Sequence, residues 1–167
     1  YLGVQLGYGF GGNVDAGGNE IDTDGVLGGV FGGWNFQNGQ FVYGLEADVN
    51  GSGMKGSNAG VEARSRVDGS VRARLGVAVT DDILVYGTAG GAAERLEVSA
   101  AGADDSQTML GYTVGAGVDA RMTEQVFARA EYRYTDYGSE DFTLPGVGTA
   151  EVDSSNHRVT LGVGFKF

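Results

Sequence analysis

The sequence predicts an all-β fold in which eight antiparallel strands close into a transmembrane barrel of the outer-membrane type. Three observations carry this prediction: apolar and polar residues alternate through eight segments, long and short connections alternate, and opposite charges fall on neighbouring strands. The 167 residues fit one domain, 1–167. No run of about 18 apolar residues is present, which excludes a transmembrane helix. A barrel stays possible, because its strands need only about 9–11 residues with one apolar face.

Each predicted strand carries apolar residues on one face and small or polar residues on the other. The segments are 1–10, 25–36, 41–50, 64–79, 83–97, 108–122, 125–137 and 156–167. In the first four segments, the faces predicted to point outward carry Leu2, Val4, Leu6, Tyr8 and Phe10 (1–10), Val26, Val30, Trp34 and Phe36 (25–36), Phe41, Tyr43, Leu45, Ala47 and Val49 (41–50), and Val67, Val71, Ala73, Leu75 and Val77 (64–79). In the last four segments, they carry Leu84 and Tyr86 (83–97), Leu110, Tyr112, Val114, Ala116, Val118 and Ala120 (108–122), Val126, Ala128, Ala130, Tyr132 and Tyr134 (125–137), and Val159, Leu161, Val163, Phe165 and Phe167 (156–167).

The connections between these segments alternate in length. Long, polar connections are predicted near 11–24, 51–63, 98–107 and 138–155, and short turns near 37–40, 80–82 and 122–124. Asn38-Gly39 in the first short turn is a strong hairpin signal. Outer-membrane barrels have short periplasmic turns and longer extracellular loops. Four long loops and three short turns therefore predict eight strands with both chain ends on the periplasmic side.

The faces predicted to point inward carry complementary charges. Acidic residues of 41–50 should lie beside arginines of 64–79, and 108–122 should pair similarly with 125–137. The predicted lumen salt-bridge network comprises Glu46, Asp48, Arg72, Arg74, Asp119, Arg121, Arg129, Glu131, Arg133 and Arg158. Buried charges are tolerated when they are paired, and eight strands leave an interior that side chains can fill. We expect a lumen plugged by salt bridges, with inward glycines making room for the arginines, and no wide pore.

A cluster of aromatic residues near the short turns predicts an interfacial girdle. Its members are Trp34, Phe36, Phe41, Tyr43, Tyr86, Phe165 and Phe167. A soluble β-sandwich would show the same alternation but would hide the apolar face from solvent. The outward Leu, Val and aromatic residues, together with the complementary inward charges, favour the membrane barrel.

The composition excludes several functions. The net charge of −11 disfavours nucleic acid, because phosphate binding needs a basic surface. There is no Cys and one His, so the usual thiol and acyl-transfer arrangements cannot be built, and we predict that the protein is not an enzyme. His157 could bind haem or metal, but an exposed histidine at a loop end is the favoured interpretation.

No cofactor is predicted apart from a divalent cation bound by loops. The segments 11–15 and 17–24 are similar to glycine-aspartate calcium loops, although the EF-hand spacing is not met. Acidic loops near lipopolysaccharide phosphates would also need Mg²⁺ or Ca²⁺ to offset repulsion.

Short motifs spread over the predicted strands resemble the alphaproteobacterial outer-membrane immunogenic proteins, a porin-family group of small OmpA-like barrels. The motifs are Gly33-Trp34-Asn35-Phe36-Gln37, Val42-Tyr43-Gly44-Leu45-Glu46, Val71-Arg72-Ala73-Arg74-Leu75-Gly76, Thr113-Val114-Gly115-Ala116-Gly117, Ala130-Glu131-Tyr132-Arg133-Tyr134 and Gly164-Phe165-Lys166-Phe167. The resemblance runs from Tyr1 to Phe167.

The resemblance implies a surface-exposed structural protein of the Gram-negative cell envelope, located in the outer membrane. It implies contact with lipopolysaccharide, insertion by the barrel-assembly machinery with Phe167 as the assembly signal, and peptidoglycan binding through a missing N-terminal segment. We expect a signal peptide to have been removed ahead of Tyr1. Some relatives are narrow porins, haemin binders or adhesins, so transport and loop-borne reception of haem or a partner protein stay open as alternatives.

Overall fold

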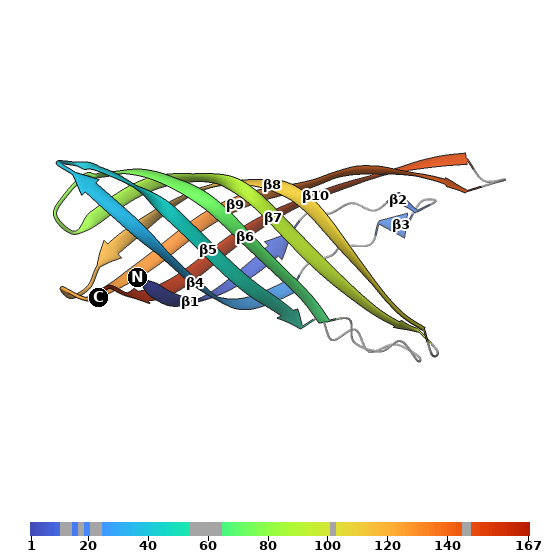
Figure 1. Cartoon of the computed structure of the whole chain (residues 1–167), viewed down its shortest axis with the longest axis horizontal. Coiled ribbons are helices and arrows are strands. Elements are labelled where there is room, and N and C mark those ends of the chain that lie inside the picture. Colours follow the sequence, from blue (N-terminus) through green and yellow to red (C-terminus); the bar gives the residue numbers. More distant parts are fainter. Residues whose placement is uncertain (11–14, 17–18, 21–24, 54–64, 101–102, 145–147) are drawn as a thin grey trace.

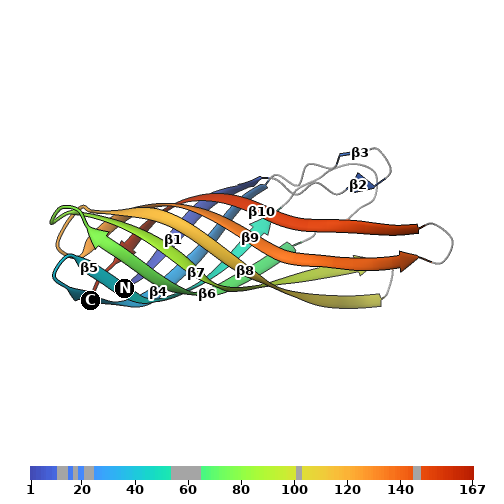
Figure 2. The same cartoon turned by 90° about the horizontal axis from the view of Figure 1, so that it is seen from above.

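The computed structural model describes residues 1–10, 15–16, 19–20, 25–53, 65–100, 103–144 and 148–167. Within these residues eight antiparallel strands close into a barrel in the order β1-β10-β9-β8-β7-β6-β5-β4 (Figures 1 and 2). The barrel strands are β1 (Leu2–Phe10), β4 (Gly25–Asn38), β5 (Phe41–Gly53), β6 (Ser65–Ala78), β7 (Ile83–Ala100), β8 (Ala103–Arg121), β9 (Val126–Leu144) and β10 (Gly148–Phe165). A two-stranded sheet pairs β2 (Asp15–Ala16) with β3 (Asn19–Glu20). The predicted fold class is confirmed.

The barrel is closed by the first and last strands. β1 pairs along one edge with β10, where Leu2 lies opposite Phe165, and along its other edge with β4, where Val4 lies opposite Val30. In the part of the barrel where all eight strands overlap, each strand pairs along both edges, so the backbone groups there are satisfied without water.

Both chain ends lie at the same end of the barrel as the three short turns, at the left of Figure 1. Gly39 has a φ of 62° in the β4–β5 turn, a conformation that glycine adopts without steric cost. The other two turns use a threonine instead. Oγ1 of Thr80 accepts a hydrogen bond from the Ile83 amide, and Oγ1 of Thr123 accepts one from the Val126 amide, each at 3.0 Å. We refer to this end as the turn end.

Two of the four predicted long loops are wrong in extent. The segments 98–107 and 138–155 largely continue as paired strand, because β7 and β8 pair up to Ala100 and Ala103, and β9 and β10 up to Leu144 and Gly148. These hairpins extend past the other strands at the right of Figure 1. Their polar sequences lack the apolar alternation that marked the other strands. The predicted loops at 11–24 and 51–63 fall mostly outside the described residues.

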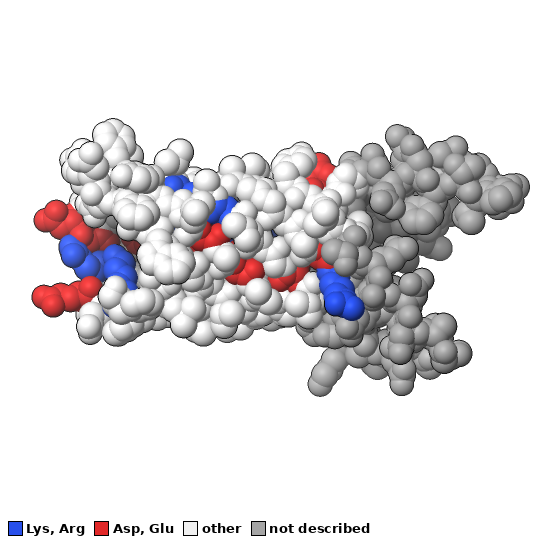
Figure 3. Space-filling model, viewed as in Figure 1, with Lys and Arg blue, Asp and Glu red and all other residues white. Residues whose placement is uncertain are grey.

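The apolar residues face outward on the barrel wall, and most of the atoms between the two ends of the barrel in Figure 3 belong to uncharged residues, with some charged atoms visible among them. The prediction for β7 is wrong in parity: Val85 is 44% exposed, whereas Tyr86 is 3% exposed and points inward. The outer face of β7 continues with small residues, Gly87, Ala89 and Gly91, so its periodicity is weak in the sequence. The described residues include no helix long and apolar enough to cross a membrane.

Candidate functional site: the ion-pair cluster in the barrel lumen

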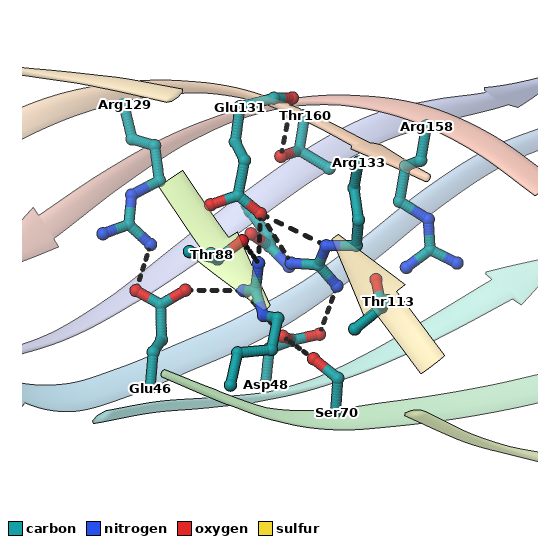
Figure 4. Close-up of polar contacts among 12 residues, drawn as sticks. Glu46, Asp48, Ser70, Thr88, Thr113, Arg129, Glu131, Arg133, Arg158 and Thr160 are labelled. Carbon is teal, nitrogen blue, oxygen red and sulfur yellow. Dashed lines mark hydrogen bonds and ion pairs between the residues drawn. The ribbon is translucent and has the colours of Figure 1, made fainter. Parts of the chain in front are cut away.

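Eight charged side chains from four strands meet in the middle of the barrel. Figure 4 labels Glu46, Asp48, Arg129, Glu131 and Arg133 among them. We call them the lumen cluster: Glu46 and Asp48 of β5, Arg72 and Arg74 of β6, Asp119 of β8, and Arg129, Glu131 and Arg133 of β9. Each points inward because it occupies the strand face opposite the apolar one. All are buried, and the four arginines balance the four carboxylates in charge.

Arg72 lies at the centre of the lumen cluster. Its Nη2 is 2.5 Å from Glu46 Oε1 and 3.0 Å from Asp48 Oδ2. Its Nη1 is 2.6 Å from Glu131 Oε1. The contacts with Glu46 and Asp48 join neighbouring strands, whereas the contact with Glu131 crosses the lumen from β6 to β9. Nη1 of Arg72 also donates a hydrogen bond to Oγ1 of Thr88 at 3.1 Å.

Arg133 closes a ring of ion pairs with Arg72. Its Nη1 is 2.9 Å from Asp48 Oδ1, and its Nη2 is 2.9 Å from Glu131 Oε1. Asp48 and Glu131 therefore each bind both arginines. Ser70 completes the shell by donating to Asp48 Oδ2 at 2.5 Å.

Arg129 and Arg74 extend the cluster toward the turn end. Nη1 of Arg129 is 2.6 Å from Glu46 Oε2, and its Nε is 2.9 Å from Asp119 Oδ1. Nη2 of Arg74 is 2.5 Å from Asp119 Oδ2. Every carboxylate of the cluster thus contacts at least two arginines, and Glu46 contacts a third, Arg74, at 3.8 Å. Such pairing offsets the large cost of removing these charges from water.

Four aromatic rings lie below the cluster on the turn-end side: Tyr1, Phe31, Tyr86 and Phe127. The guanidinium of Arg74 lies 3.6 Å from the centre of the Tyr86 ring, and that of Arg129 lies 4.1 Å from the centre of the Phe31 ring. The Tyr1 hydroxyl donates to Glu46 at 2.6 Å, and the Tyr86 hydroxyl donates to Glu131 at 2.9 Å. We call these rings the aromatic floor.

Inward glycines make room for the aromatic floor. A Cβ atom at Gly3 would collide with the Phe31 ring, one at Gly164 with the Phe127 ring, and one at Gly117 with the Tyr86 ring. The sequence predicted that inward glycines accommodate arginines. At these three positions they accommodate rings.

A third layer lies on the loop side of the cluster. Arg158 of β10 binds Asp68 of β6 through two hydrogen bonds of 2.8 and 3.0 Å. Asn50 joins this pair to the cluster, because its Nδ2 donates to Asp48 at 2.7 Å and to Asp68 at 3.1 Å. Gln5 donates to Asn50 Oδ1 at 2.6 Å. The sequence-based prediction of the network did not include Asp68, Asn50 and Gln5, although the alternation pattern places all three on inward faces.

Of the predicted network, the structure brings the eight residues of the lumen cluster together and joins Arg158 to them through Asp68 and Asn50. The prediction for Arg121 is wrong. Arg121 ends β8 at the turn end, where its Nε is 2.8 Å from Asp82 Oδ1, and it also donates to the Asp81 carbonyl. This exposed pair lies at the turn end, and among the described residues no ion pair joins Arg121 to the lumen cluster.

The aromatic residues of the predicted girdle face outward with one exception. Trp34, Phe36, Phe41, Tyr43, Phe165 and Phe167 are exposed, and Phe36 stacks on Tyr43 with ring centres 5.8 Å apart. The prediction for Tyr86 is wrong, since it belongs to the aromatic floor. Its hydroxyl finds a carboxylate partner inside the barrel, which an outward position would not offer.

A second belt of rings, which sequence reasoning missed, lies on the outer face near the loops. This outer belt comprises Tyr8, Phe10, Tyr112, Tyr132, Tyr134 and His157. His157 stacks on Phe10 with centres 5.9 Å apart, and its Nδ1 is 2.6 Å from the Tyr132 hydroxyl. His157 is half-buried among these rings and is not the exposed loop-end side chain that was predicted.

No group of acidic or histidine side chains suited to a metal ion occurs among the residues described. The predicted calcium-like segments 11–15 and 17–24 lie almost wholly outside those residues. A loop-bound cation stays a prediction.

A closed barrel with an apolar outer wall, aromatic rings near both ends and a charged lumen defines an outer-membrane β-barrel protein. The chain belongs to the family described as outer membrane protein beta-barrel domain, which matches residues 1–167. It is 45% identical over 150 residues to a 22 kDa outer membrane protein of Rhizobium leguminosarum bv. viciae, covering 90% of this chain and 70% of that protein. It is 38% identical over 168 residues to a 25 kDa outer-membrane immunogenic protein of Brucella melitensis, covering 100% of this chain and 78% of that protein.

Solved structures show the same fold. Neisserial surface protein A superposes with a TM-score of 0.69 at 16% identity, covering 99% of this chain and 96% of that one. Ail, the attachment invasion locus protein of Yersinia pestis, crystallised with the heparin analogue sucrose octasulfate, superposes with a TM-score of 0.64 at 17% identity, covering 99% of this chain and 97% of that one. The protein is therefore an outer-membrane β-barrel with relatives named as outer-membrane immunogenic proteins.

Proposed function

We propose that this protein has a structural role in the outer membrane and that its lumen is closed to solutes. The observation that carries the proposal is the lumen cluster, in which each carboxylate contacts at least two arginines inside a narrow barrel. A solute would have to break several of these pairs in a water-poor interior, where an unpaired charge is costly. The aromatic floor narrows the same path from the turn end.

A narrow porin is the competing function. A cavity of about 1010 Å³ opens at the turn end, and Tyr1, Val42, Asp119 and Phe127 are among the residues that line it. Its wall already includes Tyr1 and Phe127 of the aromatic floor and Asp119 of the lumen cluster. Transport therefore requires these side chains to move apart.

Ion conductance in a planar bilayer tests the proposal. The native protein should be silent, and Arg72→Ala and Arg133→Ala should each leak, because the first change removes a cation that three carboxylates share and the second removes one that two share. Arg121→Ala is the matched control, since it removes an arginine outside the cluster and should stay silent. Steady conductance of the native protein would reject the closed lumen and favour the porin.

The envelope partners are part of the proposal. The apolar wall would contact lipopolysaccharide, and the highly exposed aromatic residue Phe167 would bind the barrel-assembly machinery. A peptidoglycan contact through residues ahead of Tyr1 is proposed on family resemblance alone. Attachment to sulfated sugar, suggested by the Ail complex, is not favoured, because a chain of net charge −11 repels a polyanion.

A further inference from the structure

The two long hairpins, β7–β8 and β9–β10, separate from each other at the loop end (Figures 1 and 2). Pairing between β8 and β9 ends at Tyr112 opposite Asp136. Beyond this point residues 103–111 pair only with β7, and residues 139–144 only with β10, among the strands that the structure describes. Each segment therefore has one edge along which no described strand takes up its backbone N–H and C=O groups. We call these two edges the open edges.

A β-bulge in β9 lies where the two hairpins separate. Two residues of β9, Tyr137 and Gly138, lie opposite the single residue Ser154 of β10. Gly138 has a φ of 77°, which glycine adopts without steric cost. Its amide donates a hydrogen bond to Asp136 Oδ1 at 2.8 Å. A bulge bends its strand and ends pairing at the rim of a barrel, so this one turns β9 away from β8.

Two tyrosines hold the carboxylate that fixes the bulge. The Tyr112 hydroxyl donates to Asp136 Oδ2 at 3.0 Å, and the Tyr134 hydroxyl donates to the same oxygen at 3.3 Å. Tyr112 and Asp136 are also the last pair of the β8–β9 ladder. The point of separation is thus built from specific contacts, and the open edges are a fixed feature of the folded wall.

Both open edges are acidic in sequence. Their charged residues are Asp104, Asp105, Glu140 and Asp141, and 103–111 and 139–144 contain no Lys, Arg or Pro. A polypeptide that adds a strand to such an edge gains main-chain hydrogen bonds. Lysine or arginine in that strand would be attracted to the acidic residues. A second copy of this chain would bring the same acidic edges and would be repelled.

We propose that the open edges bind an extended polypeptide segment rich in lysine or arginine, which adds to the wall as a strand at the loop end. The backbone of the edges supplies affinity for any extended chain, and their acidic residues select a basic one. The bulge at Gly138 keeps the place free, because a continuous ladder between β8 and β9 would fill both edges.

A basic peptide tests the site. The probe is a fluorescent peptide of about ten residues, the length of a long strand, that alternates lysine with valine and threonine. It is titrated by fluorescence anisotropy against the full chain in phosphatidylcholine nanodiscs. N-methylation of alternate backbone amides keeps its charge but removes the donors of one edge, and should weaken binding at least about tenfold. Equal binding of the methylated peptide, or of a version with glutamate in place of lysine, would overturn strand addition to an acidic edge.

Two variants test the bulge. Deletion of Gly138 removes the extra residue, and Asp136→Ala removes the acceptor of the Gly138 amide. Each should let β9 continue beside β8 and weaken binding about tenfold, as several main-chain hydrogen bonds are lost. Asp136→Asn is the matched control, because its amide oxygen can still accept that hydrogen bond, and it should bind nearly as the native protein does. Heat-modifiable gel mobility checks folding. Native-like binding by both variants, or equal loss in Asp136→Asn, would overturn the role of the bulge.

Amide hydrogen exchange locates the bound peptide. Saturating peptide should slow exchange in 103–111 and 139–144 and leave the β4–β5 turn unchanged. Protection confined to other segments would overturn the site. Self-association of the native protein that the peptide displaces would assign the open edges to a second copy and would also overturn the proposal.

Discussion

Arg72 and Glu131 stand on β6 and β9, strands that are not neighbours, and their side chains meet across the lumen at 2.6 Å. Two further carboxylates hold the other end of the same guanidinium. This link ties distant parts of the wall together, so the lumen cluster should contribute to stability as well as to closure.

Arg72→Ala should lower the free energy of unfolding by about 3–5 kcal/mol, because it leaves buried carboxylates without their shared cation. Urea unfolding in lipid vesicles measures this change. Arg121→Ala, which breaks an exposed pair, should cost less than about 1 kcal/mol. Similar effects of the two changes would mean that the cluster is not a structural element.

Tyr86→Phe should destabilise the barrel by about 1.5–3 kcal/mol, because it removes a buried hydrogen bond to the Glu131 carboxylate. Tyr43→Phe removes a hydroxyl from an exposed girdle ring and should be nearly neutral. The same unfolding measurement compares them. A neutral Tyr86→Phe would place Tyr86 back on the outer wall.

Gly164→Ala should cost about 1–3 kcal/mol, because the added methyl group meets the Phe127 ring. Combining it with Phe127→Leu should recover part of the loss, so the two changes should be non-additive in a double-mutant cycle. Gly9→Ala adds a methyl group on an inner face where the nearest atom is 3.6 Å away, and it should be tolerated. Full additivity would show that Gly164 is needed for another reason.

Trp34 is the only tryptophan and is 76% exposed on the outer wall, so its fluorescence reports directly on the turn-end girdle. In vesicles its emission should be quenched by lipids brominated near the head group and little by aqueous iodide. Trp34→Phe should abolish the signal. Strong quenching by iodide would show that this end of the barrel stands in water.

The strand pattern and much of the lumen cluster could be predicted because both depend on local sequence. Alternation with a period of two separates the faces, and charges on adjacent hairpin strands meet once the turns set the register. The prediction of which face of β7 points outward was wrong because it also depended on local sequence alone. The outer face of β7 carries glycine and alanine, so Tyr86 gave the strongest apolar signal and was assigned to the wrong face.

The strand number, the membrane-facing wall and the inward charges were determined by the sequence itself, because each follows from residue order within single strands and hairpins. Only the tertiary structure decided which charges meet across the lumen, why glycine is required at Gly3 and Gly164, and that Arg121 lies outside the lumen cluster. These features depend on closure of the barrel, which brings strands far apart in the sequence to within side-chain reach. The alternation of apolar and polar residues carries no information about the distance between such strands across the lumen.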